Sequence, residues 1–113
     1  MMHARELFLD NLKPGKKSSD IEQVVDEYFK DEGVDKNTLH RPGHGIGLNN
    51  HEWPTLSLEN DTVLEENMVV SIEPAIYFDN QGGYRHSDTA LITKDGYQLM
   101  IDAPTSLSEL ILK

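Results

Sequence analysis

Apolar residues in the first third of the chain recur with the period of an α-helix. One helix is expected over about residues 2–12, before a Pro-Gly pair. A second is better marked, because Ser19 and Glu22 have the spacing of a capping box and Gly33 suits the left-handed position past its end. Its apolar residues share one face, which we expect to pack on a core rather than bind a partner. They fall at i, i+3, i+4, i+7 and i+8: Ile21, Val24, Val25, Tyr28 and Phe29.

After this point the pattern changes to short strands separated by turns. The run 67–78 is rich in β-branched and aromatic residues, and Pro74 divides it into two strands. A further strand is expected over 84–93, joined by a Lys-Asp-Gly hairpin turn to a partner over 97–100. Ser106 is a possible cap for a last helix. Two helices followed by antiparallel strands predict an α+β fold, with helices packed on one face of a curved, mainly antiparallel sheet.

Composition and charge narrow the class of protein. The 113 residues suffice for one domain, and 37% of them are apolar. Ten basic residues against twenty acidic ones leave a formal charge of −10, which disfavours nucleic acid and anionic membranes as partners. There is no cysteine, no membrane-spanning apolar run and no apolar stretch typical of a signal peptide near the first residue. We therefore expect a soluble, cytoplasmic protein.

The segment HRPGHGIGLNNHEWPTL, residues 40–56, holds three of the five histidines and three of the eight glycines. Pro42 and Gly43 make it a poor helix. If it is extended, the period of two places His40 and His44 on one face. The glycines then leave room for backbone or ligand to approach His44. A glycine-rich turn with surface histidines is the alternative, but three imidazoles so close together favour a functional site.

Common catalytic motifs are absent, and one carboxylate stands out instead. The glycine spacing is not that of a dinucleotide-binding loop, HEWPT is not a zinc-protease helix, and no G-x-S-x-G elbow occurs. Glu73 lies inside the apolar run VVSIEPAI, where a buried carboxylate needs a partner or a cation. The alternative is a strand-edge glutamate that faces water. Arg85 and Asp88, taken alone, could form an ordinary surface pair.

Three strings in this order resemble the pita-bread metallopeptidases of the M24 type: HRPGHGIGLNNHEWP, VVSIEPAIY and GGYRHSDTALIT. This family includes Xaa-Pro dipeptidases (prolidases), Xaa-Pro aminopeptidases, methionine aminopeptidases and creatinase. The resemblance runs from about residue 4 to residue 100. It implies that residues 1–113 are the C-terminal part of a pita-bread catalytic domain, half of the creatinase/aminopeptidase fold.

The resemblance also implies roles for individual residues. Family members bind two divalent metals (Mn, Co or Zn) through two aspartates, one histidine and two glutamates. His44 matches the histidine ligand and Glu73 the first glutamate. His51 and His40 match histidines on the substrate side, and Arg85 matches an arginine that orients the metal carboxylates. The resemblance thus makes His51, His40 and Arg85 catalytic candidates.

Two departures from the family pattern change what is expected of this chain. The aspartate ligands belong to a region before the histidine motif, and no aspartate here fits that pair. Ser87 stands where the last, bridging glutamate belongs, and a neutral hydroxyl is a weak ligand for hard divalent cations. We therefore expect no metal cofactor and no peptidase activity in this chain alone. Ser87 also weighs against two metals in a longer parent protein.

Three functions remain open for that parent. The first is a prolidase-like hydrolase acting on a small peptide. The second is a metal-free, creatinase-like hydrolase that cleaves a C–N bond of a small cationic substrate. The third is a non-catalytic binding protein that keeps the cleft. An exposed sheet edge or apolar patch, left by the missing half, would also favour a homo-oligomer.

Overall fold

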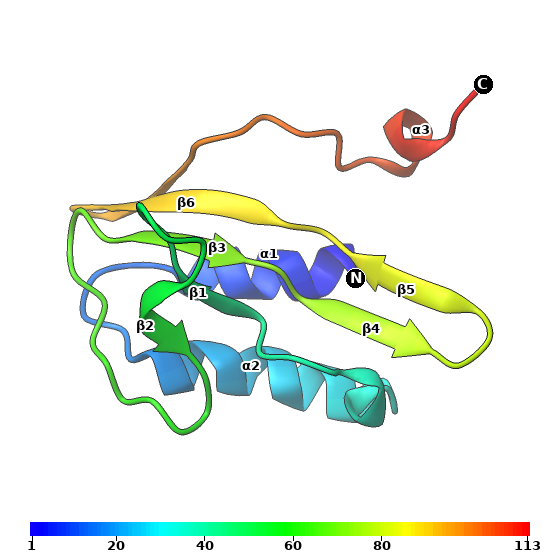
Figure 1. Cartoon of the computed structure of the whole chain (residues 1–113), viewed down its shortest axis with the longest axis horizontal. Helices are drawn as coiled ribbons and strands as arrows, with labels where there is room; N and C mark the ends of the chain where they lie inside the picture. Colours follow the sequence, from blue (N-terminus) through cyan, green and yellow to red (C-terminus); the bar gives the residue numbers. More distant parts are fainter.

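The computed structural model describes all residues 1–113 and has two layers, a layer of helices and a layer of strands (Figure 1). Helices α1 (Met2–Asn11) and α2 (Ser18–Asp31) lie side by side on one face of the sheet. A short 3-10 helix, Asp35–Asn37, follows them, and a four-residue helix α3, Leu107–Leu110, lies near the C-terminus. The expected α+β class, with helices on one face of an antiparallel sheet, is confirmed.

The strands form one sheet of five and one of two, all paired antiparallel. The five-stranded sheet has the order β2-β1-β3-β6-β7, and the two-stranded sheet is β4-β5. The strand bounds are β1 Gly43–Gly45, β2 Glu52–Leu56, β3 Val69–Ile72, β4 Ala75–Phe78, β5 Gly82–Arg85, β6 Asp88–Thr93 and β7 Gly96–Leu99.

The core lies between the two layers. Its residues are the apolar stripes of α1 and α2 and the inward positions of the strands, with one leucine from the loop before β3. Ile21, Val25 and Phe29 of the predicted stripe are buried, while Val24 and Tyr28 are partly buried. The core residues are Ala4, Phe8, Leu9, Leu12, Ile21, Val25, Phe29, Leu56, Leu64, Val70, Ile72, Ala90 and Ile92.

The predicted capping box at the start of α2 is wrong. The helix begins at Ser18, and the first helical amides are bonded by the loop before β3: the Ser18 N–H donates to Thr62 O and the Ser19 N–H to Asn60 O. The Ser19 hydroxyl donates to the carboxylate of Asp61 instead of capping the helix. Tertiary contacts therefore supply the acceptors that a capping box supplies locally. Gly33, in contrast, has the expected positive φ of 69°.

One long strand was expected over 84–93, but the structure divides it into β5 and β6 at His86 and Ser87. The reason is the partner: Pro74 interrupts the opposite strand between β3 and β4, so the ladder is lost on both sides at once. The strand division at Pro74, the β6–β7 hairpin and Ser106 as the N-cap residue of a last helix are all as predicted.

Candidate functional site

Strands β1 and β3 bring the first two candidate residues together. His44 is the middle residue of β1 and pairs across to Ser71 of β3, while Glu73 follows directly after β3. His44 is buried, with 4% of its surface exposed, and Glu73 is partly buried. The His44 Nε2 atom lies 3.1 Å from Glu73 Oε1. The proximity expected of these two side chains is therefore observed.

The hydrogen bonds of His44 show that its contact with Glu73 needs a positive charge between the two side chains. Its Nδ1 lies 2.8 Å from the carbonyl oxygen of Gly45, and a carbonyl only accepts, so Nδ1 carries a proton. In the neutral ring Nε2 is then an acceptor, and it faces a carboxylate oxygen that is also an acceptor. The contact requires a positive charge between the two atoms, either a proton or a cation.

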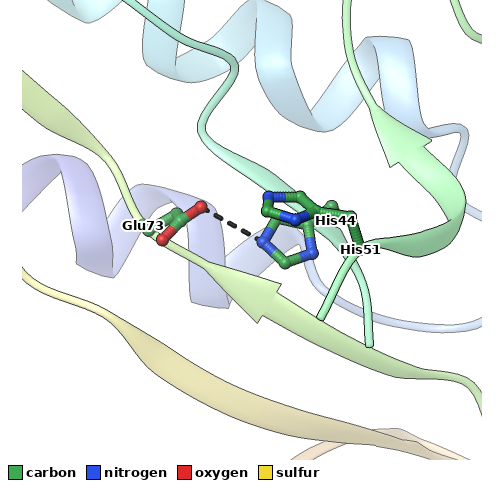
Figure 2. Close-up of side chains that lie close together, drawn as sticks. All are labelled: His44, His51 and Glu73. Carbon is green, nitrogen blue, oxygen red and sulfur yellow. Dashed lines mark hydrogen bonds and ion pairs between the residues drawn. The ribbon is translucent and has the colours of Figure 1, made fainter. Parts of the chain in front are cut away.

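His51 reaches the same place from the loop between β1 and β2. The register of these strands shifts between His44 and Gly45, so that Gly45 pairs with Glu52 and the preceding His51 returns over His44. The two imidazole rings lie with centroids 3.9 Å apart and planes at 34°. Figure 2 shows the His51 ring lying over the ring of His44, which a dashed line joins to Glu73. One ligand atom from each of the three residues lies within 4.8 Å of the others.

His40 lies on the same side of the molecule but is held by a different partner. Its Nδ1 donates to the Arg41 carbonyl oxygen at 2.8 Å, so its Nε2 accepts from the Tyr77 hydroxyl, also at 2.8 Å. The Tyr77 ring lies against Gly83 of the neighbouring strand β5, where a Cβ atom would overlap it. His40 is therefore oriented by a tyrosine rather than joined to the His44 cluster.

These side chains line an open cavity of about 670 Å³. No apolar residue contributes to its wall, which is unusual because small-molecule pockets are mostly apolar. Its two arginines and two carboxylates favour a polar or charged ligand. The lining residues are His40, Arg41, His44, Asn50, His51, Ser57, Glu59, Ser71, Glu73 and Arg85.

The register of the strands places Ser87 opposite Glu73. Ile72 pairs with Asp88 at the end of the five-stranded sheet, and Ala75 pairs with Arg85 at the start of the two-stranded one. The two residue numbers of each pair sum to 160, so the register is the same on both sides of the gap. Carried across the gap, this register puts Glu73 opposite Ser87. Ser87 is exposed and lies outside the cavity lining. A hydroxyl, rather than a second carboxylate, therefore stands across the strand from Glu73.

Arg85 lines the cavity and is exposed, but no carboxylate pairs with it. The possible surface pair of Arg85 with Asp88 does not form. Asp88 is buried instead and accepts two hydrogen bonds from Arg5 of α1, at 2.6 and 3.1 Å. The hydrogen bond that Arg5 donates to Asp88 raises the pKa of Arg5 against the opposing effect of burial. His86 Nε2 lies 3.5 Å from Asp88, so neither residue joins the His44 cluster.

A further carboxylate, Glu22 of α2, is partly buried and lines a second, smaller pocket that shares His40 with the cavity. Burial raises its pKa from 4.5 to about 7, and the nearby acids Asp26 and Glu59 act in the same direction. The backbone of Leu58 and the charge of Arg41 oppose this rise.

A single metal ion fits this cavity, but a two-metal centre does not. The cavity holds only two carboxylates, Glu59 and Glu73, and only Glu73 lies in the histidine cluster. Two bridged divalent ions need several carboxylate oxygens between them. The two-metal site is therefore incomplete in this chain.

Sequence reasoning missed Asn50, which lines the cavity, and Tyr77, which does not line it but orients His40. The Asn50 amide nitrogen lies 3.3 Å from His51 Nδ1. Tyr77 could have been found from the hairpin, because closing the turn after Phe78 pairs Tyr77 with Gly83. When an aromatic residue is opposite a glycine on the neighbouring strand, its ring lies over the glycine, which indicates where the side chain points. Asn50 carries no such signal, because its position depends on an irregular loop.

Comparison with known proteins places residues 1–94 in metallopeptidase family M24. The chain is 40% identical over 96 residues to an Xaa-Pro dipeptidase of Pyrococcus furiosus, and 38% identical over 110 residues to one of Lactobacillus delbrueckii subsp. lactis. These alignments cover 85% and 97% of this chain. The crystal structure of a prolidase from Pyrococcus horikoshii matches 94% of the chain with a TM-score of 0.90 and 36% identity.

The chain is much shorter than these relatives. It spans 28% and 30% of the two dipeptidases and 30% of the prolidase chain. An X-Pro aminopeptidase from Thermotoga maritima matches with a TM-score of 0.88, 32% identity and a similar coverage, 93% of this chain and 30% of that one. None of the helices described above is both long and apolar enough to span a membrane.

Proposed function

Because the chain belongs to metallopeptidase family M24, we propose that it is the C-terminal part of the catalytic domain of an Xaa-Pro dipeptidase-like hydrolase. The observation that supports this most is the convergence of His44, His51 and Glu73 in one polar cavity. These are the positions at which the family motif carries a metal histidine, a substrate histidine and a metal glutamate. The substrate we propose is a small peptide with proline after the scissile amide.

The residues of this chain would have distinct roles in that reaction. A bound metal ion supplies an activated water and polarises the scissile carbonyl. His51, exposed beside His44, would donate a hydrogen bond to the oxygen that gains charge in the transition state. His40, oriented by Tyr77, would contact the substrate from the other side of the cavity. Arg85 would hold a carboxylate, either of the substrate or of the missing half.

We further propose that the aspartate ligands lie in a part of the protein outside this chain. The chain contributes His44 and Glu73 to the family's ligand set, and Ser87 stands opposite Glu73. The chain alone should therefore not hydrolyse Ala-Pro or Met-Pro. Self-association and a cytoplasmic location stay predictions from the sequence.

The test is a chimera of the Pyrococcus furiosus dipeptidase in which residues 1–94 of this chain, the part that matches the family, replace the corresponding segment. Two versions are compared, one with Ser87 and one with Ser87→Glu, and both are assayed for Met-Pro hydrolysis with Mn²⁺ or Co²⁺. We expect the Ser87 version to hydrolyse Met-Pro and the Ser87→Glu version to be at least tenfold more active, since a carboxylate then lies opposite Glu73. Gln81→Glu, at an exposed position outside the cavity lining, is the matched control. Two folded chimeras that are equally inactive would contradict the proposal.

One observation favours a second candidate, a metal-free hydrolase of a small cationic amide or guanidine. The strand register sets a neutral hydroxyl, not a carboxylate, across from Glu73. Glu73 and Glu59 would then hold the cationic substrate, and a histidine of the cavity would move the proton. Turnover of creatine by a metal-depleted chimera with Ser87 would support this function. Absence of turnover on both substrates would leave a binding role for the cavity.

A further inference from the structure

We propose that the free edge of strand β7 pairs antiparallel with the same edge of a second copy of this chain. β7 is an outer strand of the five-stranded sheet and pairs only with β6. The pairing joins the two five-stranded sheets into one continuous sheet. It gives the self-association expected from the sequence a defined surface and register, and it does not depend on the proposed hydrolase function.

The backbone of β7 has hydrogen-bonding groups without partners. The Met100 N–H donates to Thr89 O at 2.8 Å, and this bond fixes which residues of β7 face β6. Inward-facing and outward-facing positions alternate along an antiparallel pair, so Gln98 also faces β6, while Tyr97 and Leu99 face outward. No segment of the chain pairs with that outward side. The N–H and C=O groups of Tyr97 and Leu99 are therefore available to another strand.

The two outer strands of the five-stranded sheet differ in how they are protected from another strand. β2, at the opposite edge, carries the charged Glu52 and also Pro54, which has no N–H to donate. Its pairing with β1 also shifts register. β7 has the sequence GYQL, with no proline and no charge, and it pairs with β6 in one unbroken register. Proteins usually protect exposed edges with proline, charge or bulges, so an edge that lacks all three favours pairing with another chain.

This edge is complementary to itself in one register. Outward residues must lie opposite outward residues, so a pairing centred on Gln98 sets Tyr97 of each copy against Leu99 of the other. Tyr97 lies across from Ile92 of β6, which is buried. Leu99 lies across from the buried Ala90, so both side chains are on the core face of the sheet. The new cross-strand pairs therefore extend the apolar layer, and the same patch on both copies gives a two-fold dimer.

Charges beside β7 select this register over its neighbours. Lys94, in the turn before β7, and Asp102, after its end, are both exposed, and neither forms an ion pair within the chain. In the pairing centred on Gln98, Lys94 of each copy lies beside Asp102 of the other. The nearest registers that keep outward groups opposite each other place Lys94 beside Met100 or Pro104 instead. Opposite charges across an interface fix its register.

The dimer should be weak. Each copy carries a net charge of −10, which opposes association, and the paired strand has four residues. Small interfaces are typical of transient complexes. We therefore expect a dimer that forms at millimolar protein concentration and dissociates on dilution.

Amide hydrogen exchange, measured by NMR on the 113-residue chain, tests the pairing directly. The Tyr97 and Leu99 amides should exchange about tenfold more slowly at millimolar concentration than in dilute solution, because pairing closes them to water. Gln98 is the internal control, since its N–H faces β6 and should be equally protected at both concentrations. If the chain self-associates and the Tyr97 and Leu99 amides exchange at unchanged rates, another surface forms the dimer and the proposal fails. A monomer at millimolar concentration also overturns it.

A charge exchange, followed by sedimentation, tests the register. Lys94→Asp and Asp102→Lys should each raise the dimer Kd about tenfold, because each sets like charges side by side at both ends of the interface. The two variants change the net charge in opposite directions, so an effect of net charge alone would weaken one dimer and strengthen the other. The double variant, with both substitutions, should regain the Kd of the unchanged chain. A double variant that stays as weak as the single ones overturns the register.

Tyr97→Pro removes the outward N–H and none that β6 uses, so the variant should keep its fold and remain a monomer. Tyr97→Phe keeps the N–H and the ring and should dimerise like the unchanged chain. Circular dichroism and the Tm of each variant check the fold. A folded Tyr97→Pro variant that still dimerises with the original Kd refutes pairing through this edge.

Discussion

Replacing Arg5 with alanine removes the counter-charge of a carboxylate that the fold has buried. The Arg5 guanidinium donates to both oxygens of Asp88, at 2.6 and 3.1 Å, and so ties α1 to the start of β6 across 83 positions of sequence. Only 12% of the Arg5 side chain and 3% of the Asp88 side chain are exposed. Without Arg5, water cannot replace the lost hydrogen bonds at Asp88.

The expected cost is large because a buried charge is left unpaired. Breaking such a pair by removing one partner typically costs about 3–5 kcal/mol. His86 Nε2 lies 3.5 Å from Asp88 and has no hydrogen-bond partner, so it can offset part of this by moving onto the freed carboxylate, and the lower end of the range is the expectation. For a chain of this length about 3 kcal/mol corresponds to a fall in Tm of about 12 °C. That is a substantial share of the about 5–15 kcal/mol that stabilises a typical domain.

The assay is urea unfolding followed by circular dichroism, compared between three variants. Lys30→Ala is the matched control, because Lys30 pairs with Asp26 at 2.6 Å but is exposed, so its loss should change stability far less than the loss of Arg5. The double variant Arg5→Met, Asp88→Leu replaces the pair with apolar groups and should recover most of the loss. If Arg5→Ala costs less than about 1 kcal/mol with an unchanged m-value, Asp88 is not isolated from water and the reasoning is refuted.

Three further outcomes follow from other contacts. Gly45→Ala places a Cβ atom against the Trp53 carbonyl oxygen and should lower stability by about 1–3 kcal/mol. Gly96→Ala is the control, because a Cβ atom there meets open space and should leave stability unchanged. Urea titration measures both variants. The pKa of Glu22 is about 7 in the folded chain against an ordinary value of 4.5, so the protonated side chain stabilises the fold. This stabilisation is fully present below pH 4.5 and is lost as pH rises through 7. Glu22→Gln should therefore be more stable than the unchanged chain by about 1 kcal/mol at pH 8 and equal to it at pH 4.5, as thermal melts will show. Light scattering should detect concentration-dependent dimers, because apolar residues such as Leu112 are exposed; a monomer at millimolar concentration would contradict this.

The sequence predicted the parts of the fold that depend on local pattern. The stripe of α2, the strand break at Pro74 and the hairpin before Gly96 each follow from residues close together in the chain. The start of α2 was mispredicted because its amides are bonded by the loop before β3, about 42 residues later. No local pattern can report an acceptor that distant residues supply.

The same limit applies to the candidate site. His44 and Glu73 were predicted to meet, because the motifs place them on neighbouring strands. The contact of His51 with His44 was not, since it depends on the shifted register between β1 and β2. The pairing of Asp88 with Arg5 was missed for a related reason: Arg85, three residues away in sequence, was the nearer candidate, but the direction of the strand turns Asp88 toward α1.

Strands β3–β4 and β5–β6 pair in one register, and this affects which substitutions the protein tolerates. Glu73 and Ser87 lie in the gap between the two ladders, so no strand pairing depends on either side chain. Ser87 is exposed, and substitutions at such positions usually alter stability by no more than about 0.5 kcal/mol. A change at position 87 can therefore add or remove a charge opposite Glu73 at little cost to folding. Under the proposed function, this one position would decide between metal-dependent and metal-free chemistry on the same scaffold.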